Sequence, residues 1–401
     1  MQIPLWIVLL FCLVWLLATI FTLRLYDECN GRKTEEQDGR KRAFPLQNDQ
    51  SALLPFGDDY NQMLTTMKIY VYDVRIGLEM KSPDDYKYGV EQLFIDLLQR
   101  SRFVTKSPAE ASLFFIPTRC TAYRKSVRDR VEGGRVAART VRRIVDWIKR
   151  THPFWNSSLG VDHAYICSHD MGGECGQLAD PNLHKNAVGL FNTADYADPW
   201  YIPHKDIALP PHPGRGVGSL SHTGRGGAGT KSVERTLLAF FAGNMKRGWV
   251  RQRVRSLFRD DPDITLIDGY LSDKEYRALL SKSKFCLCLR GNRVWSPRLM
   301  DCLWFGSVPV IIADYYDLPL ADLIDWSSIS VAVRESEIPH MKNLLLAIDA
   351  ARLKQFQMKI QKVYIHLTWN DPPLPFDAFH SVLYQLWQRN APQWKKNKQL
   401  L

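Results

Sequence analysis

A group of arginines around one carboxylate gives this chain side chains suited to binding a diphosphate. An apolar run at 285–289 predicts a buried strand, and a polar turn follows it. Ser296 and Pro297 are typical of the start of a helix, and a second strand is predicted at 308–312. Backbone N–H groups and the helix dipole favour an anion at such a turn. The candidate nucleotide-binding residues of this unit are Arg290, Gly291, Arg293, Ser296, Arg298 and Asp301.

An earlier stretch repeats this geometry. A buried strand is predicted up to Gly243, and Arg251 lies at the start of the helix that follows. Glycine at a strand end lets a phosphate or sugar approach the backbone closely. Arginines at both turns would neutralise the charge of a bound anion, and Asp301 would accept hydrogen bonds from ligand hydroxyls, as an acidic residue does in dinucleotide sites. The simpler alternatives are an exposed helix residue for Arg251 and an exposed i, i+3 ion pair for Arg298 and Asp301.

A His-Asp pair follows another predicted strand, 164–167. His169 and Asp170 lie just beyond its carboxyl end, where ligands bind in open α/β sheets. The preceding pair, Asp162 and His163, is better explained by a structural role that ties the strand to a neighbouring turn. For His169 and Asp170, a structural and a functional role both stay open.

The motifs of the first unit resemble exostosin-type glycosyltransferases, glycosyltransferase family 47, in their plant and algal forms. The similar stretches are FCLCLRGN, SPRLMDCLWFGSVPVII, LPL and IDWSSISV, in that order within 285–331. Two positions depart from the family pattern: Asp301 stands where the family usually has Glu, and Ser307 where it often has Cys. Asp is one methylene shorter than Glu, which shortens its reach to a ligand.

The resemblance implies an inverting transfer of a sugar from a nucleoside diphosphate, expected to be UDP, to a polysaccharide or glycan acceptor. It implies that Arg251 faces the diphosphate, and that no cofactor and no metal are needed. An inverting step needs a base for the acceptor hydroxyl; Asp170 is the first candidate and His169 the second. The alternative is a non-catalytic partner subunit of a glycosyltransferase complex. Homo- or hetero-oligomers with related glycosyltransferases are left open.

The same resemblance sets the expected architecture. We expect an α/β chain of the GT-B type, with two Rossmann-like domains facing across a cleft, preceded by a transmembrane helix and a stem. The expected segments are a membrane anchor at 1–24, a stem at 25–66, an acceptor-side domain at 67–213, a Gly-rich linker at 214–230, a nucleotide-sugar-binding domain at 231–385 and a basic tail at 386–401.

The nearly unbroken apolar run from Ile3 to Leu23 is long enough to span a bilayer as a helix. No basic segment precedes it and no small-residue cleavage site follows, so a retained anchor is favoured over a signal peptide. Arginines and lysines follow the span and would keep the rest of the chain cytoplasmic by the positive-inside rule. The resemblance implies the opposite, a single-pass type II protein of the Golgi membrane with a luminal catalytic part. Asn156-Ser-Ser would be a glycosylation acceptor there.

The net charge of +11 and the pI near 9.2 suit nucleotide phosphates, anionic polysaccharide, a membrane surface or nucleic acid. We do not expect a nucleic-acid partner, because the basic helix at 128–150 lacks interleaved aromatic residues and a base-reading element. The triplet Asp261-Pro-Asp263 is interpreted as a turn rather than a metal site.

Eight cysteines are present, and none of them form a CxxC pair, so a zinc site is not expected. Cys120, Cys167 and Cys175 would form a disulfide in a luminal setting, but the sequence leaves the pairing open.

Overall fold

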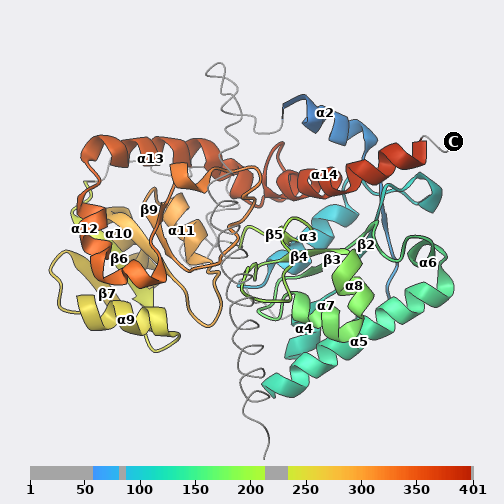
Figure 1. The fold of residues 1–401 in the computed structure, drawn as a ribbon, viewed down its shortest axis with the longest axis horizontal. Coiled ribbons are helices and arrows are strands. Elements are labelled where there is room, and N and C mark those ends of the chain that lie inside the picture. The colour runs from blue at the N-terminus through green and yellow to red at the C-terminus, as the bar shows by residue number, and fades with distance from the viewer. Residues whose placement is uncertain (1–56, 81–86, 213–233, 399–401) are drawn as a thin grey trace, which may run out of the picture. The chain divides into compact units, whose positions relative to one another are not determined.

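The computed structural model describes residues 57–80, 87–212 and 234–398. They form two parallel α/β halves (Figure 1), each built on a five-stranded sheet. The expected anchor 1–24 and linker 214–230 lie outside the described residues, as does most of the expected stem. Within the described part, no helix combines the length and the apolar character needed to cross a membrane.

The first half alternates strands and helices in the predicted way. Its sheet has the order β1-β2-β3-β4-β5 with all strands parallel. The strands are β1 (Ile69–Val71), β2 (Leu113–Ile116), β3 (His163–Cys167), β4 (Val188–Phe191) and β5 (Ile207–Ala208). The helices are α2 (Gly57–Thr66), α3 (Val90–Gln99), η2 (Pro108–Glu110), α4 (Cys120–Lys125), α5 (Arg130–Thr151), α6 (Phe154–Ser158), α7 (Gly173–Ala179) and α8 (Pro181–Asn186).

One isolated bridge completes the topology of this sheet. Val104, which follows α3, pairs in parallel with Ile69 on the side of β1 that faces away from β2. With that bridge counted as a reduced second strand, the winding reverses between β1 and β2. This is the doubly wound, Rossmann-like pattern with a switch point.

The second half has the same winding without a reduced strand. Its order is β10-β9-β8-β6-β7 and all its pairs are parallel, so β6 lies next to β8 and the winding reverses between them. The strands are β6 (Leu237–Gly243), β7 (Ile264–Asp268), β8 (Ser283–Leu289), β9 (Val308–Ile312) and β10 (Val331–Ala332). The helices are α9 (Trp249–Phe258), α10 (Asp273–Lys282), α11 (Arg298–Trp304), η4 (Trp326–Ser328), η5 (Glu335–His340), α12 (Met341–Leu346), α13 (Ala350–Val363), η6 (Tyr364–Leu367) and α14 (Ala378–Lys398).

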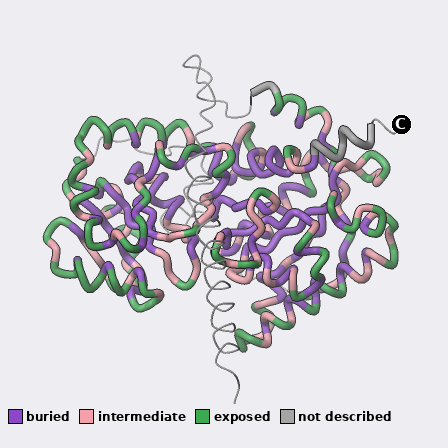
Figure 2. Tube along the Cα trace, viewed as in Figure 1, coloured by how far each residue is buried: buried purple, intermediate pink, exposed green. Residues whose placement is uncertain are grey.

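Side chains on successive residues of the first sheet enter two different cores, as the two-residue period of a strand requires. Phe115 and Ile166 belong to a core shared with α2, α3 and α14, whereas Phe114 and Tyr165 belong to a core with α4, α5 and α7. The strands of both halves are accordingly buried along most of their length (Figure 2). Helices on both faces explain why the strands read as continuous apolar runs.

The expected domain boundaries differ from the structure at both ends. The end of the expected stem forms α2, whose Tyr60 and Met63 are buried. The expected basic tail at 386–401 is in large part the continuation of α14, in which Trp387 donates a hydrogen bond to Thr66 Oγ1 at 3.1 Å. Contacts with distant segments thus extend the fold beyond the points where composition changes.

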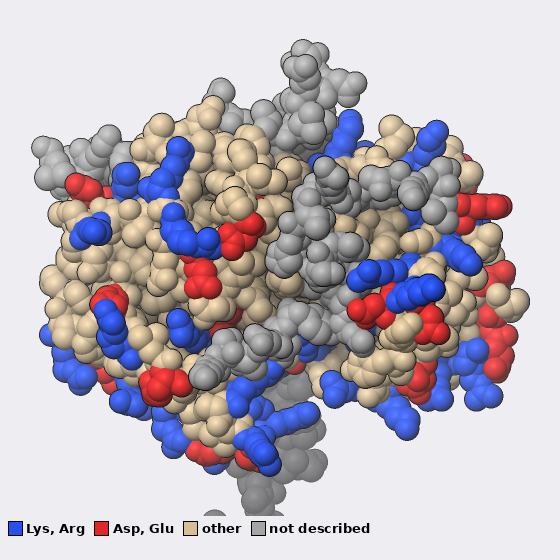
Figure 3. All heavy atoms as spheres, turned by 180° about the vertical axis from the view of Figure 1, so that it is seen from behind, with Lys and Arg blue, Asp and Glu red and all other residues tan. Residues whose placement is uncertain are grey.

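The basic helix is present as α5, and much of its charge is used within the molecule. Asp129 caps it by accepting a hydrogen bond from the N–H of Glu132. Arg142 donates to the carbonyls of Leu178 and Ala179, and Lys149 pairs with Asp180. On the face of the molecule in Figure 3, acidic side chains lie among the basic ones. These contacts use part of the charge of α5 within the molecule, and the absence of a nucleic-acid partner stays an expectation.

Candidate functional site

The carboxyl ends of β6 and β8 meet at the switch point of the second sheet, the position at which doubly wound folds bind ligands. The turn 244–248 follows β6 and the turn 290–297 follows β8. The two turns touch through their backbones: a Cβ placed on Gly248 would lie 2.6 Å from the carbonyl oxygen of Gly291, and φ at Gly248 is +78°. Glycine is therefore required at Gly248 both by space and by conformation.

Arg251 and Arg298 converge at this switch point. Both guanidinium groups lie over the ring of Phe241 from β6, at 5.3 Å for Arg251 and 4.1 Å for Arg298. Arg251 donates to the carbonyls of Asn244 at 3.1 Å and Leu289 at 3.3 Å, and Arg298 donates to that of Ala242. The side chain of each arginine thus extends from its helix and is hydrogen-bonded to the end of a central strand.

The charge of this arginine pair is not balanced by the protein. Within the described residues, neither guanidinium has a carboxylate partner, and Nε of both and Nη1 of Arg298 are buried without a hydrogen-bond partner. Burial, with Arg298 and Arg247 adding to it, lowers the pKa of Arg251 to about 10. Two adjacent cations with unused donors are the arrangement that an anion such as a diphosphate would satisfy.

The other residues predicted for this site lie close to Arg251 and Arg298. Asp301 is buried on α11 and accepts a hydrogen bond from the hydroxyl of Tyr276 at 3.1 Å. The helix begins at Arg298, later than predicted, and Ser296 Oγ accepts from the backbone N–H of Arg298 at 3.3 Å. A Cβ on Gly243 would lie 3.0 Å from Arg298 Nη2, and a Cβ on Gly291 would lie 2.8 Å from Arg251 Nη2. The space that these glycines leave is therefore filled by the arginines.

Arg290 and Arg293 lie apart from the pair, and their charges are balanced. Arg290 bonds to Asp195 at 3.2 Å and to Glu335 at 3.4 Å, and Arg293 bonds to Asp198 at 3.0 Å. Asp195 and Asp198 belong to the first half, so these arginines connect the two halves. Their predicted contact with a diphosphate stays a prediction, and the structure shows them in ion pairs.

The two halves are joined by further bonds near these ion pairs. Tyr196 donates its backbone N–H to Tyr315 O at 2.8 Å, and Asp317 donates to Ala194 O at 2.9 Å. In addition, the hydroxyl of Tyr201 donates to the carboxylate of Asp317 at 2.5 Å. The loop after β9 is thereby held against the first half.

His169 and Asp170 follow β3, as predicted, and Trp295 from the second half reaches them. The indole N–H of Trp295 donates to Asp170 Oδ1 at 3.0 Å, and Lys87 Nζ lies 3.4 Å from Asp170 Oδ2. His169 stacks on Tyr88 with a centroid distance of 4.7 Å. Trp295 lies in the turn 290–297 after β8. Its hydrogen bond to Asp170 therefore connects the predicted base to the turn that is predicted to bind the nucleotide.

The environment separates the two candidates for the base. Burial raises the pKa of Asp170, but Lys87, His169, Tyr88 and Trp295 together hold that pKa below its usual value, so the carboxylate is ionised at neutral pH. Burial lowers the pKa of His169 to about 4. His169 Nδ1 accepts from the N–H of Met171 at 3.2 Å, so the neutral ring carries its proton on Nε2. His169 can donate at Nε2, and Asp170 can accept a proton.

Glu91 is a functional candidate that the sequence did not single out as such. Its carboxylate is buried on α3 and accepts backbone N–H bonds from Thr121 and Ser168, both at 3.0 Å. Burial raises the pKa of Glu91 to about 8. Because Ser168 directly precedes His169, Glu91 fixes the start of the loop that carries the His-Asp pair. Its signal in the sequence was weak, since one Glu on an apolar helix face reads as an ordinary amphipathic position.

Three further polar motifs named in the sequence have defined surroundings in the structure. Asp162 bonds to His163 Nδ1 at 2.6 Å, and the hydroxyl of Tyr72 lies 2.8 Å from His163 Nε2, so that pair has the structural role expected. Lys342 pairs with Asp261 and with Asp263, both at 2.8 Å, in the turn between α9 and β7. Asn156 is exposed on α6.

Comparisons with known proteins cover most of the described chain. The family model described as "Exostosin GT47 domain" matches residues 63–348. The Arabidopsis thaliana protein "Probable glycosyltransferase At3g07620" is 30% identical over 346 residues, which cover 83% of this chain and 71% of that protein. "Probable glucuronosyltransferase 47 A" of Physcomitrium patens is 25% identical over 348 residues, covering 79% and 74%. Among solved structures, that of Anabaena Alr3699/HepE in complex with UDP covers 82% of this chain and 100% of that one, at 11% identity and a TM-score of 0.42.

Proposed function

The chain belongs to the exostosin GT47 family, and from this premise we propose that it is a glycosyltransferase. It moves a sugar from a UDP-sugar to a polysaccharide or glycan acceptor, with inversion at the transferred carbon. The observation that carries the proposal is the arginine pair at the β6/β8 switch point. Arg251 and Arg298 have no carboxylate partner within the described residues, and three of their buried N–H groups are unused.

The chemistry follows from the charges at the two sheet edges. The diphosphate binds at the arginine pair, where the guanidinium groups neutralise the charge that grows as the sugar–phosphate bond breaks. On the facing edge, Asp170 accepts the proton of the acceptor hydroxyl while that oxygen attacks the anomeric carbon. Trp295 fixes the carboxylate of Asp170 relative to the donor turn. In this mechanism the arginines take the part that a cation has in other transferases, and no metal is needed.

UDP binding tests the proposal on the full chain by titration calorimetry. We expect micromolar affinity, about −7 to −8 kcal/mol. Arg298→Ala should weaken it by roughly 10- to 100-fold, because a charge-assisted bond contributes about 1.5–3 kcal/mol. Arg253→Ala, which removes an exposed arginine of the same helix α9, is the matched control and should leave the affinity unchanged. Equal losses in both variants, or no binding of UDP by the folded chain, would refute the assignment.

A non-catalytic partner subunit is the second candidate, and one observation favours it. Asp170 is held at a lowered pKa by Lys87 and Trp295, which weakens its proton affinity. Asp301, one methylene shorter than the Glu usual in the family, points the same way. UDP binding with no sugar transfer or donor hydrolysis from any UDP-sugar would select this candidate, whereas turnover that requires Asp170 would exclude it.

The proposed location is the Golgi membrane, with the described part of the chain in the lumen. The support is the apolar run 3–23 and the exposed sequon at Asn156. Glycosidase treatment of the chain from a eukaryotic host should increase its mobility on a gel, and Asn156→Gln should abolish that change. An unglycosylated, protease-accessible chain on sealed vesicles would place it in the cytosol instead.

A further inference from the structure

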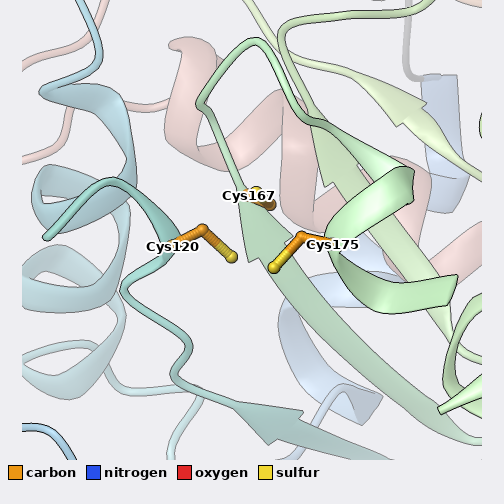
Figure 4. Close-up of side chains that lie close together, drawn as sticks. All are labelled: Cys120, Cys167 and Cys175. Carbon is orange, nitrogen blue, oxygen red and sulfur yellow. The ribbon is translucent and has the colours of Figure 1, made fainter. Parts of the chain in front are cut away.

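Three cysteines meet beneath the edge that carries His169 and Asp170. Cys120 is the first residue of α4, Cys167 the last residue of β3, and Cys175 lies on α7. Their sulfur atoms all lie within 4.8 Å of one another, and all three residues are fully buried in the core on the α5 side of the sheet. In Figure 4 the side chains of Cys120 and Cys175 point toward each other, with Cys167 beside them on the strand.

A metal does not suit this cluster. Thiolate sites for zinc take four ligands, and among the described residues no further His, Asp, Glu or Cys completes the group. A divalent cation with three thiolates would leave a net negative charge in a core of apolar and aromatic side chains, and such a buried charge is costly without a partner. A disulfide with one remaining thiol is neutral and needs no further ligand.

The second half shows the oxidation state that the chain reaches. Cys286 on β8 and Cys302 on α11 form a disulfide, and the thiol of Cys288 remains 3.6 Å from the sulfur of Cys302. A chain with such a bond belongs to an oxidising environment, where neighbouring thiols are oxidised as well. Two bonded cysteines and one free thiol are therefore also the expected outcome for the cluster in the first half.

We propose that Cys120 and Cys175 form a disulfide that ties α4 to α7 across the end of β3, and that Cys167 stays a free thiol. The facing side chains of Cys120 and Cys175 select this pair among the three possible ones. Cys167 is fixed in the sheet by the pairing of β3 with β4, in which it lies opposite Phe191. The helices, unlike the strand, can adjust to bring their sulfur atoms together.

The chemistry of the bond is ordinary thiol–disulfide exchange with a small-molecule or protein disulfide. The thiolate of Cys175 attacks the oxidant and releases one of its two thiols; Cys120 then loses its proton, attacks Cys175 and releases the second. Two thiols are oxidised and one disulfide is reduced. Because the sulfur atoms are fully buried, the exchange takes place while the domain folds.

The consequence for activity rests on the proposed function. The segment between Cys167 and Cys175 contains the His-Asp pair, and α4 begins directly before Thr121, whose N–H bonds to Glu91. The disulfide would restrain α4 and α7, the two helices next to the loop that carries His169 and Asp170. Its loss should therefore raise the KM or lower the kcat of a glycosyltransferase without removing any group that contacts substrate.

Peptide mapping tests the bond itself and does not depend on activity. The full chain, produced in the secretory pathway of a eukaryotic host and extracted from its membranes, is alkylated under denaturing conditions without reductant, digested and analysed by mass spectrometry. We expect a peptide pair linked through Cys120 and Cys175, with Cys167 and Cys288 alkylated. Alkylation of all three cysteines, a linkage through Cys167, or stoichiometric zinc or copper with three free thiols would each overturn the proposal.

Variants give an independent readout of the same bond. Cys175→Ala and the double variant Cys120→Ala, Cys175→Ala should lose the same amount of thermal stability, roughly 5 °C in Tm, because either change breaks the same crosslink. Cys167→Ala is the matched control and should keep the linked peptide. Independent, additive losses from Cys120→Ala and Cys175→Ala would show that the two residues are not joined. Mapping that succeeds while UDP binding fails would leave the disulfide established and refute only the glycosyltransferase.

Discussion

The two halves share one winding and differ in the charges at their carboxyl edges. At the β6/β8 switch point, two arginines are held together by backbone carbonyls with no carboxylate partner among the described residues. At the facing edge of the first half, Asp170 and His169 lie with Lys87 and Trp295, and the buried Glu91 holds the loop behind them. The same topology thus gives one edge suited to an anion and another suited to moving a proton.

The arginines of the second half differ in whether their charges are paired. An arginine with buried, unused donors destabilises a folded protein unless something bonds to it, so the arginine pair makes sense as a binding site. Arg290 and Arg293, which flank Gly291 and Asn292 in the turn after β8, are paired with carboxylates and stabilise the contact between the halves. Arginines near the same edge of the second sheet therefore have different roles.

The largest effect is expected at Asp170, the proposed base beyond the carboxyl end of β3. Asp170→Asn should lower kcat by about 100- to 10,000-fold, the usual contribution of a general base, and leave UDP affinity within about twofold. Steady-state kinetics and calorimetry measure the two quantities. Asp260→Asn, in an exposed turn, is the control and should match the unmodified chain. An equal loss of UDP binding in Asp170→Asn would mean that the two edges are not separate in function.

At the anion-binding edge, the double variant Arg251→Ala, Arg298→Ala should bind UDP less well than either single variant, by roughly 100-fold or more relative to the unmodified chain. Its Tm should change little, because removal of the repulsion between the two cations offsets the loss of their hydrogen bonds to the carbonyls of the strand ends. Differential scanning calorimetry measures the Tm. A clear fall in Tm would show that the pair is structural rather than a ligand site.

Glu91 should make stability depend on pH. Burial raises its pKa from 4.5 to about 8, so the folded state keeps a proton that the unfolded state releases. The free energy of unfolding should therefore be highest below about pH 4.5, fall by about 1.4 kcal/mol per pH unit up to about pH 8, and lose this contribution fully above that value. Denaturant titrations from pH 5 to 9 should show the slope in the unmodified chain and a smaller one in Glu91→Gln. Parallel curves for the two proteins would contradict the assignment.

The smallest effect is expected at the ion pairs between the halves. Arg293→Ala removes a partly exposed pair with Asp198 and should lower the free energy of unfolding by about 0.5–1 kcal/mol, with UDP affinity unchanged. Asp198→Ala should lose more, because Asp198 Oδ1 also accepts the backbone N–H of Trp200 at 3.0 Å, and the double variant should lose no more than Asp198→Ala. A tenfold loss of UDP affinity in Arg293→Ala would instead place this arginine on the diphosphate, as the sequence suggested.

Much of this picture could be predicted from the order of residue types along the chain. Strand ends, helix starts and turns are local features, so the turn after β8 and the position of Asp170 were both predictable. The motifs within 285–331 also predicted the family. The reduced second strand at Val104 and the full length of α14 were not, because each depends on what packs against it.

What only the tertiary structure decided is which charges have partners. Arg290 and Arg293 meet carboxylates 95 residues away, and Trp295 meets Asp170 across 125 residues. The sequence determined that arginines would gather at the carboxyl end of β8, since that follows from the strand–turn–helix pattern. It did not determine that Arg251 and Arg298 remain without a carboxylate partner there, because electrostatic pairing depends on distance through space, and only folding sets those distances.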